Sequence, residues 1–140
     1  WQGWRTLHEP IVWILHLAYA WLPFGLALKA LAILTGMTAA AFWLHALTIG
    51  ALATMILGVM TRVSLGHTGR PLRVRPLVTL AYLLVAAATI VRVFGAWLPG
   101  FDYPAVIVLS AALWTTAFAL FLWVYGPILF TSSIDARARR

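Results

Sequence analysis

The sequence predicts an all-α integral membrane protein, a bundle of four transmembrane helices with both termini in the cytoplasm. Hydrophobic residues make up 64% of the 140 residues and charged residues only 9%, which leaves too little polar surface for a soluble domain of this length. Four apolar stretches each reach about 20 residues, the length at which a helix crosses a bilayer. The positive charges outside these stretches also fall on one side of the predicted bundle.

The predicted spans form a single domain and cover residues of about 11–34, 38–60, 77–98 and 105–130. Gly36 predicts a tight turn after the first span, and the second span contains no charged residue. Glycines and prolines between residues 62 and 76 predict a loop rather than a continuing helix. Pro99, Gly100 and Pro104 interrupt the chain before the fourth span, and a polar, basic tail follows it.

The orientation follows from the basic residues that lie outside the spans. These are Arg5, Arg62, Arg70, Arg73, Arg75, Arg137, Arg139 and Arg140. The other two loops hold no Lys or Arg, and one of them holds Asp102. Because positive charges stay on the cytoplasmic side, both termini are expected there. The same clustering beside apolar spans explains the net charge of +7 without nucleic acid, so the bilayer is the expected partner.

The second span carries a ladder of small residues on one face. Ala46, Gly50, Thr54 and Gly58 recur every four residues, so they share a stripe of the helix. Small residues at this period let another backbone, or a flat cofactor, come close within a membrane. We therefore expect this span to lie at the centre of the bundle.

A polar layer is expected in the outer half of the membrane, where His45, Lys29 and Arg92 fall at a similar depth. A structural interpretation lets both cations reach the outer headgroups while His45 bonds a neighbouring carbonyl. A functional interpretation makes the layer an anion site, for example for haem propionates, with His45 as the metal ligand. The residues alone leave both interpretations open.

A second polar layer is expected near the inner surface. His16 lies at the level of Met60, Tyr82 and Tyr125, with His67 in the loop below, and histidine with methionine suits copper or haem iron. The four histidines nevertheless show no compact metal-binding spacing, and there are no cysteines. With only three acidic residues the chain gives little support to hydrolytic or phosphoryl chemistry, so no enzyme is predicted.

The remaining candidates are Arg62, just before the stretch SLGHTGRPLRVR that follows the second span, and His67 and Arg70 within that stretch. It has two interpretations. Its arginines could meet anionic lipid at a cytoplasmic turn. Alternatively, His67 and Arg70 could project from a rigid turn, framed by glycines, toward a ligand or a partner.

Several strings in the chain resemble the NnrS family. They are HALTIGALATMILGVMTRVSLGHTGRPL at residues 45–72, LHLAYAWLPFGL at 15–26, FALFLWVYGPIL at 118–129, the ALW at 112–114, and Arg92. The resemblance covers nearly the whole chain, and TRVSLGHTGRPL is more specific than hydrophobicity alone. By this resemblance, the family's polar motif positions are His16, His45, Arg62, His67 and Arg70.

The resemblance implies a multi-pass protein of the bacterial inner membrane that is connected with nitric-oxide stress and binds haem and copper. The histidines 16, 45 and 67 are then the candidate metal ligands, while Arg92 and Lys29 would meet haem propionates. NnrS members have about twelve spans, and this chain resembles their C-terminal third. A metal site that draws ligands from both parts would therefore need the N-terminal spans or another membrane subunit to complete it.

Two other functions stay open at this point. The chain could be a cofactor-free structural subunit of a larger membrane complex, which would suit its eight Trp residues and apolar exterior. It could also be part of a transporter in which the outer cations form an anion path. Bound colour separates the haem hypothesis from both, and co-purifying subunits would identify the structural one.

Overall fold

A computed structural model describes residues 6, 8–36, 42–97, 100 and 102–131 of the chain. The described elements are helical, and four helices are long and apolar enough to cross a membrane, which confirms the predicted fold class. The elements are α1 (Pro10–Thr35), α2 (Trp43–His45), the π-helix η3 (Ala46–Ala53), α3 (Thr54–His67), α4 (Pro76–Phe94), the 3-10 turn η4 (Gly95–Trp97) and α5 (Tyr103–Leu129).

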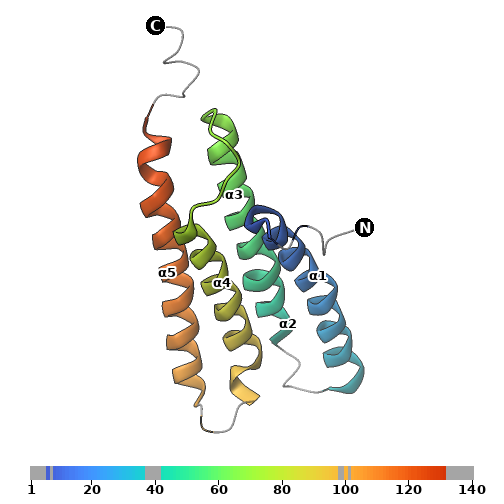
Figure 1. The fold of residues 1–140 in the computed structure, drawn as a ribbon. Coiled ribbons are helices and arrows are strands. Elements are labelled where there is room, and N and C mark those ends of the chain that lie inside the picture. Colours follow the sequence, from blue (N-terminus) through green and yellow to red (C-terminus); the bar gives the residue numbers. More distant parts are fainter. Residues whose placement is uncertain (1–5, 7, 37–41, 98–99, 101, 132–140) are drawn as a thin grey trace, which may run out of the picture.

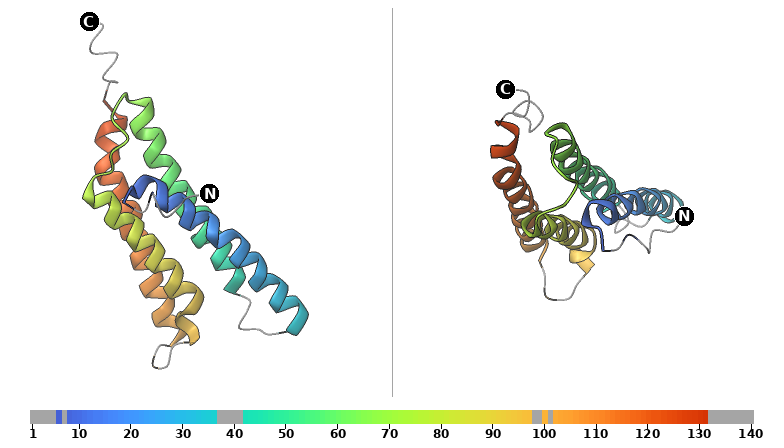
Figure 2. Two further views of the ribbon diagram at one scale, coloured as in Figure 1. Left: turned by 45° about the vertical axis from the view of Figure 1, so that its right-hand side comes forward. Right: turned by 45° about the horizontal axis from the view of Figure 1, so that its top comes forward.

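The four spans alternate in direction, and the two middle ones are the more buried. The run α2–η3–α3 forms one continuous span that packs against α1, and α4 packs along α5. Two different views place α1 and α5 on opposite sides of the molecule (Figures 1 and 2). The apolar windows of α1 and α5 are each 22% buried, against 39% for the two middle spans, so the outer helices turn most of their surface outward.

The largest hydrophobic cluster fills the half of the bundle nearer the α3–α4 connection. It joins all four spans through buried side chains such as Ile14, Leu57, Tyr82, Phe121 and Tyr125. A smaller cluster at the other end contains Leu28, Ala46 and Val93. Because lipid is itself apolar, this close van der Waals packing, rather than exclusion of water, holds the helices together.

The small-residue ladder faces neighbouring helices, as predicted. Ala46, Gly50, Thr54 and Gly58 are all buried. A Cβ atom on Gly50 would lie 2.7 Å from the Trp21 ring of α1. The glycines therefore permit a backbone approach that no larger residue would allow.

The predicted loop at residues 62–76 is wrong over its first part, because α3 continues to His67. Arg62 and His67 are therefore helical, and the connection to α4 spans only residues 68–75. Ser64 and Leu65 are buried in this added turn, and Leu65 belongs to the main hydrophobic cluster. Tertiary packing thus extends the helix through Gly66. The predicted start at residue 38 lies outside the described residues, which resume at Phe42.

The end of α3 is a Schellman motif centred on Gly69. This glycine has φ of 68°, a left-handed conformation that side chains disfavour. The Gly69 amide donates to the Gly66 carbonyl at 3.2 Å, and the Arg70 amide donates to the Leu65 carbonyl at 3.0 Å. Pro71 then prevents further helix. Only Gly69, and not Gly66, supplies the special backbone shape, and the motif fixes where Arg70 leaves the helix.

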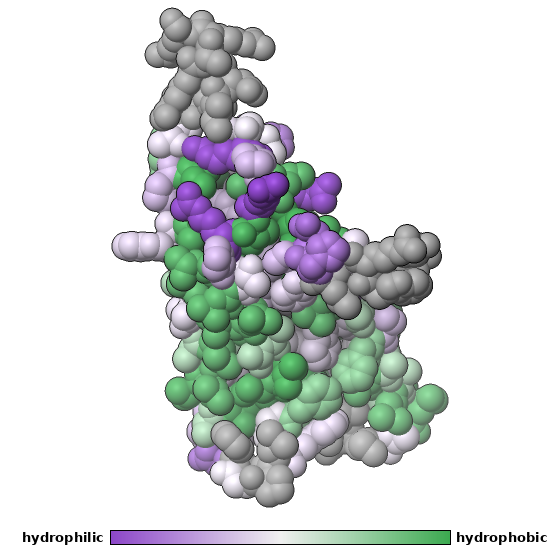
Figure 3. Space-filling model, in the orientation of Figure 1, coloured by the Kyte–Doolittle hydropathy of each residue, from purple (hydrophilic) through white to green (hydrophobic). Residues whose placement is uncertain are grey.

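Hydrophilic side chains gather at the end of the molecule formed by the α3–α4 connection and the last turns of α5, while apolar side chains cover the middle (Figure 3). At the opposite end, Asp102 caps α5 by accepting a hydrogen bond from the Ala105 amide at 3.1 Å. This distribution of polar ends and apolar middle fits a protein embedded in a bilayer.

Candidate functional site

His45 stands at the start of a rare backbone feature. The π-helix η3 begins with the next residue and runs through Ala53. π-helical turns are uncommon and occur frequently at functional sites, because they widen a helix locally. At its end the Thr54 hydroxyl donates to the Ile49 carbonyl, five residues back, at 3.0 Å. Nothing in the spacing of apolar residues predicted this segment.

Arg92 lies near His45, as the depth comparison predicted. It occupies the last turn of α4, and the two residues are close enough for their charges to interact. Its guanidinium carbon lies 5.6 Å from the centre of the Tyr103 ring. The Nη1 atom of Arg92 is nevertheless buried without a hydrogen-bond partner among the described residues. Leaving a buried guanidinium nitrogen without a partner is costly, and an anionic group that reached Arg92 would remove this cost.

A hollow of about 410 Å³ opens beside Arg92 between η3, α4 and α5. Its walls are mostly apolar, and among the described residues that line it only Arg92 is charged. The lining residues are Thr48, Ile49, Ala53, Arg92, Ile107, Ser110, Ala111 and Trp114. A mainly apolar hollow with few polar groups is the usual form of a small-molecule or cofactor site, and this volume falls in the usual range of about 300–1,000 Å³.

Aromatic side chains surround the same end of the bundle. The Phe42 ring lies 6.3 Å from the His45 ring and 6.4 Å from the rings of both Trp97 and Tyr103, measured between centroids. Phe94 extends the group, at 5.7 Å from Trp97. Such rings suit both the membrane interface and the face of a flat cofactor. The spacing of residues alone did not predict this cluster, although aromatic residues beside the α1–α2 and α4–α5 turns were a signal for it.

Lys29 does not join His45 and Arg92 at the hollow. Its ammonium nitrogen lies 4.8 Å above the Trp43 ring, in a cation–π contact between α1 and α2. The side chain is exposed. This geometry agrees with the structural interpretation for Lys29, a lysine that reaches toward the interface.

The inner candidates are dispersed. His16 is half-buried on α1, whereas the buried rings of Tyr82 and Tyr125 lie beside Thr61. Met60 is 38% exposed on α3. His67 is exposed at the far end of the second span, and helix geometry puts it about 30 Å from His45. These two histidines therefore cannot ligate one metal ion.

Arg62 and the residues of the SLGHTGRPLRVR stretch divide between two surfaces. Arg62 and His67 line a shallow hollow of about 380 Å³ together with Val63, Gly66 and Leu72. Arg70 instead lines a separate cavity that opens toward α5. Among the residues that the structure describes, no group of three or more His, Cys, Asp or Glu side chains could hold a metal ion.

Four apolar helices of membrane-spanning length, with hydrophilic residues gathered at one end, define an integral membrane protein. Residues 1–132 match the family model described as "NnrS protein". The chain therefore belongs to the NnrS family. A search of curated proteins and a search of solved structures found no match.

Proposed function

We propose that this chain is a haem-binding protein of the bacterial inner membrane that serves in the response to nitric-oxide stress. His45 is the proposed axial ligand, and Arg92 is the proposed partner of a haem propionate. The carrying observation is the buried, unpaired Nη1 atom of Arg92, which stands beside both His45 and an apolar hollow.

The residues at this end of the bundle fit such a group. A half-buried imidazole offers a ligand, the unpaired guanidinium offers a charge for a carboxylate, and aromatic rings offer flat contacts. Haem would supply an iron centre able to bind nitric oxide. Lys29 is not required in this arrangement because Trp43 already contacts its ammonium group.

Copper is the other metal that the family resemblance implies, with His16 and His67 as further candidate ligands. Copper sites in proteins generally combine several nitrogen or sulfur ligands. Since the described histidines are dispersed, a copper site would need ligands from other membrane spans or another subunit. Haem needs only one axial histidine from this chain, whereas copper needs several ligands, so we favour haem.

The test is an absorption spectrum of the full chain purified in detergent from haem-replete cells. We expect a Soret band that His45→Ala removes or shifts. Arg92→Gln should leave the band in place but lower haem retention about tenfold or more, because it removes a charge partner and not a ligand. His67→Ala is the matched control and should retain both the band and the haem.

Two outcomes would contradict the assignment. A band that survives His45→Ala unchanged would move the ligand to another residue, with His16 as the first candidate. No band at all in the native chain would favour the alternative function, a cofactor-free structural subunit of a larger complex.

A further inference from the structure

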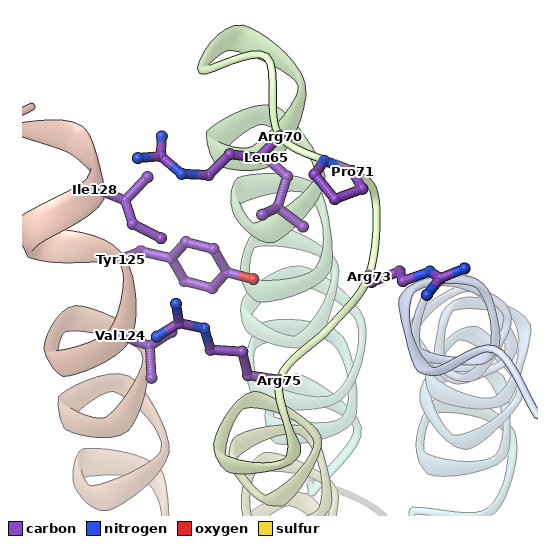
Figure 4. Close-up of a pocket in the computed structure, with 8 residues that line it drawn as sticks. All are labelled: Leu65, Arg70, Pro71, Arg73, Arg75, Val124, Tyr125 and Ile128. Atoms are coloured by element: carbon purple, nitrogen blue, oxygen red, sulfur yellow. The ribbon is translucent and has the colours of Figure 1, made fainter. Parts of the chain in front are cut away.

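A second cavity lies at the opposite end of the molecule, between the end of α3, the connection to α4, and the last turns of α5. Its volume is about 190 Å³. Arginines form its polar side and apolar residues of α3 and α5 form the other side. The lining residues are Leu65, Arg70, Pro71, Arg73, Arg75, Val124, Tyr125 and Ile128 (Figure 4).

Arg70 and Arg75 both extend toward α5, on either side of the Tyr125 ring, whereas the guanidinium group of Arg73 points away (Figure 4). The Schellman motif pins the Arg70 backbone through its 3.0 Å hydrogen bond to Leu65. The Arg70 Nη1 atom is buried and has no hydrogen-bond partner among the described residues. The charge of Arg75 acts on Tyr125, so this arginine also reaches the cavity.

The surroundings make this cavity electropositive. Arg75 is the N-cap residue of α4, whose first turn contains no acidic residue and has no side-chain cap. The positive end of the α4 dipole therefore adds to the two guanidinium groups. Of the three acidic residues, Glu9 precedes α1, Asp102 caps α5 at the opposite end, and Asp135 lies outside the described residues.

We propose that this cavity binds one phosphate-type oxyanion, held by Arg70 and Arg75. Guanidinium groups bind phosphate oxygens in pairs of parallel hydrogen bonds, which would satisfy the unpaired Nη1 atom. The cavity is smaller than most ligand sites, which suits a phosphate group rather than a large cofactor. This chemistry can come from the phosphodiester of an acidic lipid or from free phosphate.

The first measurement is the thermal unfolding of the full chain in an uncharged detergent. Sodium phosphate should raise Tm by roughly 5 °C over sodium chloride at equal ionic strength if free phosphate binds. The second measurement is native mass spectrometry after release from lipid nanodiscs. Selective retention of one phosphatidylglycerol over phosphatidylcholine would identify the lipid headgroup as the occupant.

Arg70→Gln should abolish whichever response the native chain gives. Arg62→Gln is the matched control, because it removes the same charge from an exposed site on α3 that does not line this cavity. If Arg70→Gln does not yield folded protein, Arg75→Gln tests the same site. The proposal is overturned if neither phosphate nor phosphatidylglycerol has a selective effect, or if Arg62→Gln reduces the response as much as the cavity variants do. Haem plays no part in either measurement.

Discussion

Buried side-chain atoms that lack a hydrogen-bond partner point to the candidate binding sites of this chain. Within its described part they belong to Arg70, Tyr82 and Arg92. Both arginines line cavities, where an anion can complete them. The buried hydroxyls of Thr61 and Thr89, by contrast, donate to the carbonyl four residues earlier in their own helices, so they need nothing further. Tyr82 is the exception, since it is fully buried within the hydrophobic core.

Tyr82→Phe should leave the stability of the protein unchanged or raise it by about 1 kcal/mol. Thr61 lies beside the hydroxyl groups of both Tyr82 and Tyr125, but the Tyr82 hydroxyl forms no hydrogen bond of ordinary geometry. Removing a buried hydroxyl that lacks a partner removes its desolvation cost, whereas the ring and its packing against Trp13 remain. Thermal unfolding in detergent measures the change.

Tyr125→Phe is the comparison for this substitution. Its hydroxyl lies beside Thr61 and near the charge of Arg75, so its removal should cost about 1 kcal/mol. A loss of stability from Tyr82→Phe equal to that from Tyr125→Phe would show that the Tyr82 hydroxyl has a partner, such as a bound water.

At the scale of elements, the contact between α1 and η3 depends on Gly50. Gly50→Ala should destabilise the protein by about 1–3 kcal/mol, because the added Cβ would lie 2.7 Å from the Trp21 ring and 2.9 Å from a Thr89 methyl carbon. Those groups come from two different helices, so the clash cannot be relieved by moving one side chain. The measurement is again thermal unfolding of the purified chain.

Gly66→Ala provides the control on the same span. Apart from its chain neighbours and its own helix backbone, no atom lies within 4 Å of the position that its Cβ would occupy, and the residue is helical. Replacing a helical glycine by alanine there should stabilise the protein by up to about 1 kcal/mol. If both substitutions were tolerated equally, the packing of Gly50 against α1 and α4 would not matter to stability.

The helices were largely predictable from long apolar runs separated by glycines and prolines, because helices in lipid must be long and apolar. The burial of Gly50 and Gly58 followed from their spacing. The extension of α3 to His67 did not, because it depends on Leu65 packing into a core built by other spans. The loop prediction took the local propensity of both Gly66 and Gly69 to end the helix. Tertiary packing keeps Gly66 inside α3, and only Gly69 ends it.

The candidate sites were predictable only in part. Comparison of depths brought His45 and Arg92 together, since helix rise is regular. It could not reveal the π-helix η3, which changes the direction of side chains along the span. The loop prediction also grouped Arg70 with Arg62 and His67, because it assigned the end of α3 to a loop. The Schellman motif instead turns Arg70 toward α5, where Arg75 and Tyr125 meet it.

At the scale of the whole molecule, the two cavities lie at opposite ends. The 410 Å³ hollow lies toward the turn between α4 and α5, and the arginine cavity lies beside the connection between α3 and α4. The positive-inside rule predicts that the arginine cavity faces the cytoplasm, where phosphate and the phosphates of the inner leaflet both occur. The proposed haem site would then face the outer leaflet. This assignment depends on the orientation of the chain.

Cysteine labelling tests the orientation, and the absence of native cysteines makes each label unambiguous. Thr35→Cys lies at the end of α1 and Leu72→Cys lies in the α3–α4 connection, both at exposed positions. In right-side-out spheroplasts, a membrane-impermeant maleimide should label Thr35→Cys directly. It should label Leu72→Cys only after the membrane is permeabilised, because basic loops stay inside. Direct labelling of Leu72→Cys together with protection of Thr35→Cys would show that the protein has the opposite orientation. The arginine cavity would then face the outside of the cell.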